Sequence, residues 1–452
     1  MNYLTHNYRI IIILCTALLS GCNKLLDEKS DLKLSTPESV QDFQALLDRV
    51  TDVNINYAGS GEVCSDNYYL TDAGYAGLKN EEDKRLYTWQ PDHVALSGTS
   101  GNDWRYCYKT IYSANSVIYG IKQKNLTGAD NVKGQALAIR ASRYLDAVIV
   151  WAPVYNKATA DRDLGVPLRL DPDMNPGSKR ASVKACFDQI IQDLNEAKEL
   201  LPAKPIALTR ASKGFAYGLL ARAYLYMGDY NLALANALEA LKYNNLLIDY
   251  NALNPNDKVP IKDMNVEFVF WGTMRLAPPI GVSIAFIPET LYNLYGENDL
   301  RKEILFNKNA NGTISFRGDY TGSSNSKIMG VTTAELYLIA AEGYARSGQL
   351  LEAEKIVEKL QSNRWKKGKY SPMKDLGQEE LVTLILQERR KELLFRGLRW
   401  GDLKRLNREG ANITLTRSVA GTSYTLPPND KRYAIAIPED IIYMSGIEQN
   451  ER

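Results

Sequence analysis

Histidine is almost absent from this chain, whose 452 residues include only His6 and His93. One histidine in the mature chain cannot build a zinc site of two or three histidines. Only His93 remains for a Ser–His or Cys–His pair, and no nucleophile elbow lies near it. The sequence also lacks a P-loop, a dinucleotide-binding fingerprint and a zinc motif. Carboxylates are therefore the main candidates for any catalysis.

Other shortages narrow the class of protein further. The net charge is only +2, and no basic run carries interleaved aromatics, so we predict no nucleic-acid partner. No run beyond residue 22 approaches a transmembrane helix. Phenylalanine is scarce, with 9 residues against 28 tyrosines. A tyrosine ring has a flat apolar face and a polar tip, which suits a sugar-binding surface or a core that uses tyrosine in place of phenylalanine.

The first 21 residues are predicted to be a lipoprotein signal peptide. Arg9 precedes a short apolar run over 10–19, which is too short to span a membrane comfortably. The run ends in Leu19-Ser20-Gly21-Cys22, which matches the bacterial lipobox, in which the cysteine thiol takes the lipid. We therefore predict lipidation of Cys22 and a lipidated tether over 22–35.

Three cysteines remain in the mature chain besides Cys22, namely Cys64, Cys107 and Cys186. The odd number leaves at least one thiol without an internal partner. A Cys64–Cys107 bridge and three buried free thiols are both compatible with the sequence.

Apolar residues at helical spacing predict helices over 37–50, 104–122, 133–151, 183–201 and 378–396. Thr36 is the predicted N-cap of the first helix. Residues 51–103 are rich in glycine, asparagine, aspartate and aromatics without sustained periodicity. We interpret them as long ordered loops, a feature that is usually functional in a compact protein.

Two further helical pairs, residues 214–241 and 333–360, share one spacing and form an internal repeat. Alanine allows close helix crossing, and glycine in the turn permits a positive φ. The pattern resembles the tetratricopeptide repeat, and a third hairpin is predicted around an insertion at 152–180. Residues 244–331 read as an irregular insertion. The repeated positions are Ala221, Tyr224, Gly228 and Ala233, matched by Ala341, Tyr344, Gly348 and Ala353; the third hairpin would use Ala141, Tyr144, Leu194 and Ala197; and Thr332 with Glu335 forms a capping box before the second repeat.

Several motifs together resemble the SusD/RagB family of Bacteroidetes surface lipoproteins. The likeness extends over essentially the whole mature chain, although the C-terminal Gln449-Asn450 is not followed by the Pro-Gly tail that the family often shows. The motifs are the lipobox, the repeat helices, Glu388-Arg389-Arg390-Lys391-Glu392-Leu393 leading to Gly397-Leu398-Arg399-Trp400-Gly401-Asp402-Leu403, Trp104 with Tyr108 and Ala114-Asn115, Arg140-Ala141 with Tyr144, and Gly165-Val166-Pro167-Leu168.

The resemblance implies a mostly α-helical, SusD-like fold over residues 36–452. Tetratricopeptide-like hairpins near 133–243 and 332–362 would form a scaffold packed against a loop-rich variable half that includes the insertion 244–331. It also implies an outer-membrane location, lipid-anchored and facing the cell exterior. The partners would be a SusC-like TonB-dependent transporter and an oligosaccharide or peptide ligand. No catalysis and no cofactor are expected.

Two alternative functions stay open. Glu388 and Glu392 lie one helical turn apart and could serve a surface glycoside hydrolase as its paired carboxylates. Neighbouring arginines favour an ion-pair network instead, which would depress both carboxylate pKa values. The other alternative is a tetratricopeptide-type scaffold that binds only protein.

Sugars need flat aromatic faces and short polar side chains, and residues 54–75 supply both. We predict a ligand-binding surface in which this segment is joined by side chains of the insertion, as SusD-like geometry implies. The Asp66–Asp72 loop offers oxygen ligands for Ca²⁺, but no EF-hand spacing is present. The residues predicted to bind ligand are Tyr57, Asn67, Tyr68, Tyr69, Tyr75, Arg275, Tyr292, Tyr295 and Tyr320, with Asn54, Asn56, Ser65, Asp66, Asp72 and Asp319 nearby.

The lipid anchor can be tested directly. Cells that express the protein should incorporate labelled palmitate into it and retain it with membranes, because two or more acyl chains anchor stably. Cys22→Ala should abolish both the label and the membrane retention. Membrane-free wild-type protein without label would contradict the prediction.

Overall fold

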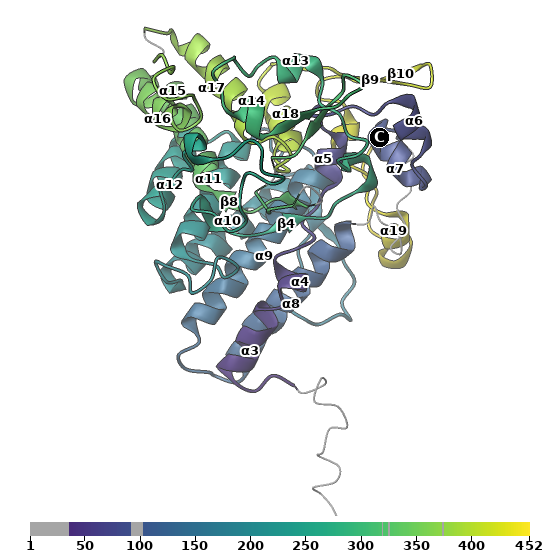
Figure 1. Ribbon diagram of the computed structural model, residues 1–452. Coiled ribbons are helices and arrows are strands. Elements are labelled where there is room, and N and C mark those ends of the chain that lie inside the picture. Colours follow the sequence, from purple (N-terminus) through teal and green to yellow (C-terminus); the bar gives the residue numbers. More distant parts are fainter. Residues whose placement is uncertain (1–35, 92–102, 319, 324–325, 373–374) are drawn as a thin grey trace, which may run out of the picture.

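The computed structural model describes residues 36–91, 103–318, 320–323, 326–372 and 375–452. The predicted signal peptide, Cys22 and the tether lie outside these residues, as do His93 and Asp319. Helices dominate the described chain, and its strands form five two-stranded sheets, set among loops (Figure 1).

Most of the long helices are those that the apolar spacing predicts. The exception is α18, which follows the Gly397 turn and was not predicted as a separate helix. The long helices are α8 (Asp103–Gln123), α9 (Asp130–Trp151), α10 (Val183–Leu200), α11 (Lys213–Met227), α12 (Tyr230–Tyr243), α15 (Thr333–Arg346), α16 (Leu350–Ser362), α17 (Gln378–Glu392) and α18 (Arg399–Arg408).

The N-terminal part differs from its prediction. The first helix is capped by Ser39, whose hydroxyl accepts from the Asp42 N–H while Asp42 bonds back, so the predicted Thr36 cap is wrong. The described part of 51–103, which was predicted as loops, contains short helices as well as loops. The short helices of the N-terminal part are α3 (Val40–Leu47), α4 (Val50–Val53), α5 (Ser60–Cys64), α6 (Asp72–Ala76) and α7 (Glu81–Tyr87).

Short elements fill the remaining connections and the C-terminal region. In the 152–180 insertion and its boundary lie β1 (Leu164–Pro167) and β2 (Arg180–Ser182). The larger insertion holds η2 (Tyr250–Ala252), β3 (Phe268–Phe270), β4 (Thr273–Met274), η3 (Pro278–Ile280), α13 (Glu289–Tyr292), α14 (Arg301–Ile304), β5 (Phe306–Lys308), β6 (Ile314–Phe316), β7 (Lys327–Ile328) and β8 (Val331–Thr332). The C-terminal region holds β9 (Leu415–Val419), β10 (Thr422–Leu426), η4 (Lys431–Tyr433) and α19 (Glu439–Ser445).

The repeat pairs form stacked hairpins. Gly228 and Gly348 occupy the turns with φ of +84° and +78°, as the spacing predicts. Helix α12 packs against α15, so that the second hairpin stacks on the first, and α10 packs on both α9 and α11. The repeat therefore buries its apolar faces between neighbouring hairpins, as such arrays do.

The predicted capping box at Thr332 is wrong, although the helix begins there. The Thr332 side chain makes no cap hydrogen bond. Glu335 instead pairs with Arg222, 2.6 Å away on α11, and both side chains are buried. The Glu335 carboxylate is therefore used in a tertiary ion pair and not in the capping box.

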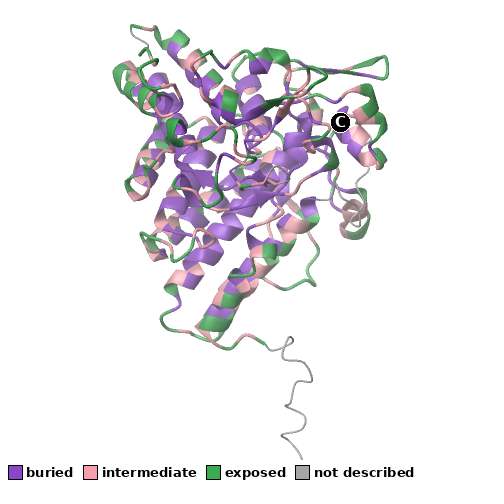
Figure 2. Ribbon diagram, in the orientation of Figure 1, coloured by how far each residue is buried: buried purple, intermediate pink, exposed green. Residues whose placement is uncertain are grey.

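Helix α9 is the centre of the fold, and nearly every residue on it is buried (Figure 2). Its polar side chains fix neighbouring segments: Arg140 pairs with Asp193 of α10 at 2.7 Å, and Arg143 donates to the Val53 carbonyl at 2.8 Å. The thiols of the core are unpaired, since Cys64, Cys107 and Cys186 are all buried and free.

Asp146 of α9 holds the segment before α5, because its Oδ2 accepts the Ala58 N–H at 2.7 Å. Burial raises the pKa of this carboxyl to about 6, and the attraction of Arg143 only partly opposes the rise. The folded pKa is thus above that of the unfolded chain, near 3.9. Ionisation therefore destabilises the fold, with no effect below about pH 4 and the full effect above about pH 6.

Asp146→Asn should consequently raise the free energy of unfolding by about 1–3 kcal/mol at pH 7.5. The gain should shrink as the pH falls from 6 toward 4, which urea unfolding at several pH values would measure. Asp188→Asn, on the exposed face of α10, is the control and should change stability by less than about 0.5 kcal/mol. No gain at neutral pH would contradict the raised pKa.

Candidate functional site

Six of the nine side chains predicted to bind ligand are buried in the structure, so their predicted exposure is wrong. Their polar ends are satisfied inside the core. The Tyr68 hydroxyl donates to the Val63 carbonyl at 2.9 Å, and the Tyr295 hydroxyl donates to the Lys391 carbonyl at 2.8 Å. The six buried residues are Tyr57, Asn67, Tyr68, Tyr292, Tyr295 and Tyr320.

Cations cover several of these rings. The Arg143 guanidinium lies 3.4 Å from the centre of the Tyr57 ring, and that of Arg396 lies 4.3 Å from Tyr320. The ammonium of Lys302 lies 4.7 Å from the Tyr292 ring. A sugar would have to displace these cations to reach the ring faces, so the tyrosines act as packing and cation–π partners.

Three predicted residues keep exposed surface, and their part in binding stays a prediction. Tyr69 is 37% exposed. Tyr75 is half-buried beside Tyr87, with ring centres 6.0 Å apart. Arg275 is also half-buried, with its guanidinium 4.8 Å from the Tyr106 ring.

The acidic loop 66–72, whose oxygens could have offered ligands to Ca²⁺, is already engaged. Asp66 pairs with Arg399 at 2.7 Å and with Arg390 at 2.9 Å. Asp72 accepts the Ala420 N–H at 2.8 Å. Within the described residues, no three histidine, cysteine, aspartate or glutamate side chains gather as a metal site.

Around Tyr69 the structure builds a surface that the sequence did not predict. Tyr69 and Phe286 form an isolated antiparallel bridge, and Phe286 forms a second such bridge with Ser315 of β6. Ser315 lies opposite Asn307 of β5. Opposite residues point to the same face, so these four side chains form one row, which we call the aromatic row.

The aromatic row offers both kinds of contact that a sugar needs. The ring centres of Tyr69 and Phe286 are 6.0 Å apart, and both rings are at least partly exposed. Beside them stand the exposed Asn307 amide and the half-buried Ser315 hydroxyl. The Asn309 amide donates to Ser315 Oγ at 2.8 Å and holds it in place.

The paired carboxylates of the hydrolase alternative lie in a buried ion network. Glu388 is 2.6 Å from Arg301 and 2.8 Å from Lys391. Glu392 is 2.8 Å from Arg301 and 2.7 Å from Arg364. The predicted network is present, but its cations are not the four arginines nearest in sequence. Those arginines serve other groups: Arg389 pairs with Asp402, Arg390 and Arg399 pair with Asp66, and Arg396 donates to Thr332.

The electrostatics of this network oppose acid catalysis. Burial alone would raise the pKa of Glu388, but Arg301 and Lys391 outweigh it and hold that pKa well below its usual range. Arg364 and Arg301 likewise outweigh burial and lower the pKa of Glu392. Both groups are buried anions at neutral pH, whereas a general acid must hold a proton.

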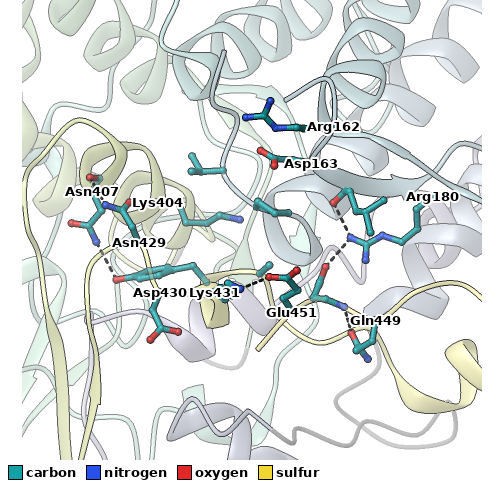
Figure 3. A pocket seen from close by; sticks show the side chains of 16 residues that line it. Arg162, Asp163, Arg180, Lys404, Asn407, Asn429, Asp430, Lys431, Gln449 and Glu451 are labelled. Atoms are coloured by element: carbon teal, nitrogen blue, oxygen red, sulfur yellow. Dashed lines mark hydrogen bonds and ion pairs between the residues drawn. The ribbon is translucent and has the colours of Figure 1, made fainter. Parts of the chain in front are cut away.

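A separate cavity of about 390 Å³ lies between the segment after α9 and the C-terminal residues (Figure 3). Its lining includes Pro153 and Leu164 from the first of these segments, and Tyr433 and Asn450 from the C-terminal region. None of these was predicted as a site residue. The lining elements are far apart in sequence, so no local signal could have revealed the cavity.

Comparison with known proteins identifies the family of this chain. Residues 24–225 match the family described as "Starch-binding associating with outer membrane", and residues 297–443 match the SusD family. The chain belongs to the SusD/RagB family. This membership confirms the resemblance, and the structure confirms the mostly α-helical fold.

Relatives of this family cover nearly all of the chain. A SusD-like protein of Formosa agariphila is 24% identical over 88% of this chain and 90% of its own length. A SusD superfamily protein of Bacteroides thetaiotaomicron has a TM-score of 0.74 at 20% identity, over 92% of this chain and 100% of that one. A SusD-like carbohydrate-binding protein of Bacteroides vulgatus has a TM-score of 0.69 at 20% identity, over 91% and 97%.

None of the helices in the described ranges has both the length and the apolar character needed to cross a bilayer.

Glu392→Gln should destabilise the fold by about 3–5 kcal/mol, because it leaves Arg301 and Arg364 with less than their full complement of buried charge. Denaturant unfolding would measure the loss. Glu352→Gln is the control, since Glu352 pairs with Lys355 on an exposed helix face and should contribute less than about 1 kcal/mol. A stable Glu392→Gln protein would show that the network does not depend on this charge.

Proposed function

We propose that this protein is a surface-exposed lipoprotein that binds oligosaccharide and delivers it to a SusC-like TonB-dependent transporter, with no catalysis. Family membership supports the class of ligand, since one matching family is described as starch-binding and one solved relative as carbohydrate-binding. The predicted lipid on Cys22 would hold the protein at the outer membrane, beside a transporter of that membrane.

The aromatic row is the observation that carries this proposal. Two neighbouring rings, Tyr69 and Phe286, both keep some exposed surface, and Asn307 and Ser315 lie beside them in the row. A pyranose ring has apolar C–H faces and hydroxyl groups around its edge. Rings can therefore bind its face while the amide and hydroxyl bind its edge.

The buried ion network argues against the hydrolase alternative. Glu388 and Glu392 are enclosed among Arg301, Arg364 and Lys391, so a glycosidic bond could reach neither carboxylate without unfolding the surrounding core.

Tyr69→Ala should weaken oligosaccharide binding by about tenfold, because it removes the exposed ring of the aromatic row. Calorimetric titration of the non-lipidated protein with maltoheptaose, xylohexaose and oligogalacturonate would first find the best ligand and then measure the loss. Phe286→Ala should act in the same direction.

Tyr443→Ala is the matched control, because this tyrosine is 92% exposed on α19 and lies outside the row. Equal affinities of the wild-type and Tyr69→Ala proteins would place the glycan elsewhere on the surface. Release of new reducing ends from any of these glycans would support the hydrolase alternative. Co-purification with a TonB-dependent barrel from solubilised outer membranes tests the delivery step.

A further inference from the structure

The C-terminal cavity is lined by two cations that lack carboxylate partners. The first is Lys404 of α18, which is only 4% exposed. Its ammonium donates to the carbonyls of Ile149 and Ala152, each at 2.6 Å, at the C-terminal end of α9. The described residues supply no third acceptor for this ammonium. Burial lowers its pKa to about 7, as expected for a desolvated cation without a counter-ion.

The second cation is Arg180 of β2. Its guanidinium donates to the carbonyls of Leu164, Gly165 and Glu448 and to the Asn450 side-chain oxygen, at 2.7–3.0 Å. All four acceptors are neutral. The carboxylate of Glu448 is near enough to favour the charged form, but burial prevails and the pKa of Arg180 is lowered.

The anions around the cavity are already engaged. Glu451 pairs with Lys431, and Asp430 pairs with Arg432 at 2.8 Å. Asp163 accepts a hydrogen bond from the neutral Thr159 hydroxyl and keeps its charge. The lining holds four cations, Lys404, Arg180, Arg162 and Lys431, against three carboxylates, Asp163, Asp430 and Glu451, so it keeps a small excess of positive charge.

We propose that this cavity binds a small molecule bearing a carboxylate, of the size of one or two sugar rings, with the carboxylate directed at Lys404 and Arg180. A buried charge without a counter-ion is costly, and a ligand anion would offset that cost. The volume of about 390 Å³ lies within the range of small-molecule sites.

The rest of the lining fits such a ligand. Pro153, Val154 and Leu164 supply apolar lining, and Tyr433 adds an aromatic ring. That ring is fixed by stacking on Trp400, with centres 4.7 Å apart. The body of the ligand would pack against these surfaces while its carboxylate meets the cations, an arrangement typical of small-molecule sites.

The cavity shares no residue with the aromatic row, so this inference is independent of the proposed function. A carboxylate of this size could belong to an acidic sugar or to a short peptide, and the ligands tested must separate these sources. Galacturonic acid represents the first and glycylglycine the second. Galactose is the neutral match of galacturonic acid.

The test is a titration of the folded protein followed by calorimetry or by NMR. We expect saturable binding of at least one carboxylate and at least about tenfold weaker binding of galactose, because a charge-assisted bond is lost. Lys404→Met keeps the length of the side chain but removes its charge, and should weaken carboxylate binding by at least about tenfold.

Lys431→Met is the matched control, because Lys431 lines the same cavity but already pairs with Glu451. It should change the affinity by less than about twofold. Since Lys404 also holds the end of α9, Val154→Trp provides a second variant that fills the cavity without altering charge. It should abolish binding while the protein stays folded.

Three results would overturn the proposal. They are no saturable binding of either carboxylate by the wild-type protein, galactose binding as tight as that of galacturonic acid, and full binding by the folded Val154→Trp variant. Binding of the acid sugar alone, of the dipeptide alone, or of both would support it and identify the source of the carboxylate.

Discussion

Two buried arginines hold the irregular half of this molecule to its helices. Arg301, in the insertion, pairs with Asp299 beside it and with Glu388 and Glu392 of α17. Arg364, just after α16, joins Glu392 to Glu267 of the insertion. Removing any one of these charges would leave its partners buried without full compensation, which is far more costly than losing a surface pair. The network therefore favours a single arrangement of insertion and scaffold, although the insertion has few regular elements of its own.

That arrangement places the aromatic row. Asp66, which lies three residues before Tyr69, pairs with Arg390 of α17 and Arg399 of α18. The Tyr69 backbone then pairs with Phe286, and Phe286 with Ser315, both within the insertion. The runs at 388–393 and 399–402, which carry the family resemblance, therefore have a structural role. Their charged side chains pair with Asp66 and with the insertion, and so they fix the loops that carry the aromatic row.

The parts of the fold that were predictable depend on local spacing. Gly228 and Gly348 mark turns because a positive φ is a property of the residue itself, and the alanines mark crossings because their size is local. The predicted exposure of the tyrosines was wrong because their burial depends on partners that are remote in sequence. The Tyr295 hydroxyl, for example, donates to the Lys391 carbonyl, 96 residues away. The capping box failed in the same way, since Glu335 pairs with Arg222, 113 residues earlier. Of the aromatic row, the sequence predicted only Tyr69. Phe286, Ser315 and Asn307 were missed because the backbone pairing that brings them beside Tyr69 leaves no pattern in either segment of the sequence.

Lys404, at the wall of the cavity, differs from the other buried cations that donate mainly to carbonyls. Arg143 donates to carbonyls, but its guanidinium lies on the Tyr57 ring at 3.4 Å. Arg417 also donates to carbonyls, and the rings of Tyr87 and Trp89 lie 3.8 and 4.5 Å from it. Aromatic faces thus supply the negative potential that carboxylates supply elsewhere. Lys404 lies on a cavity wall and has no such ring contact among the described residues. The other buried cations discussed above are surrounded by carboxylates or by aromatic faces, whereas Lys404 borders open space. An anionic ligand is the group that would complement this cation.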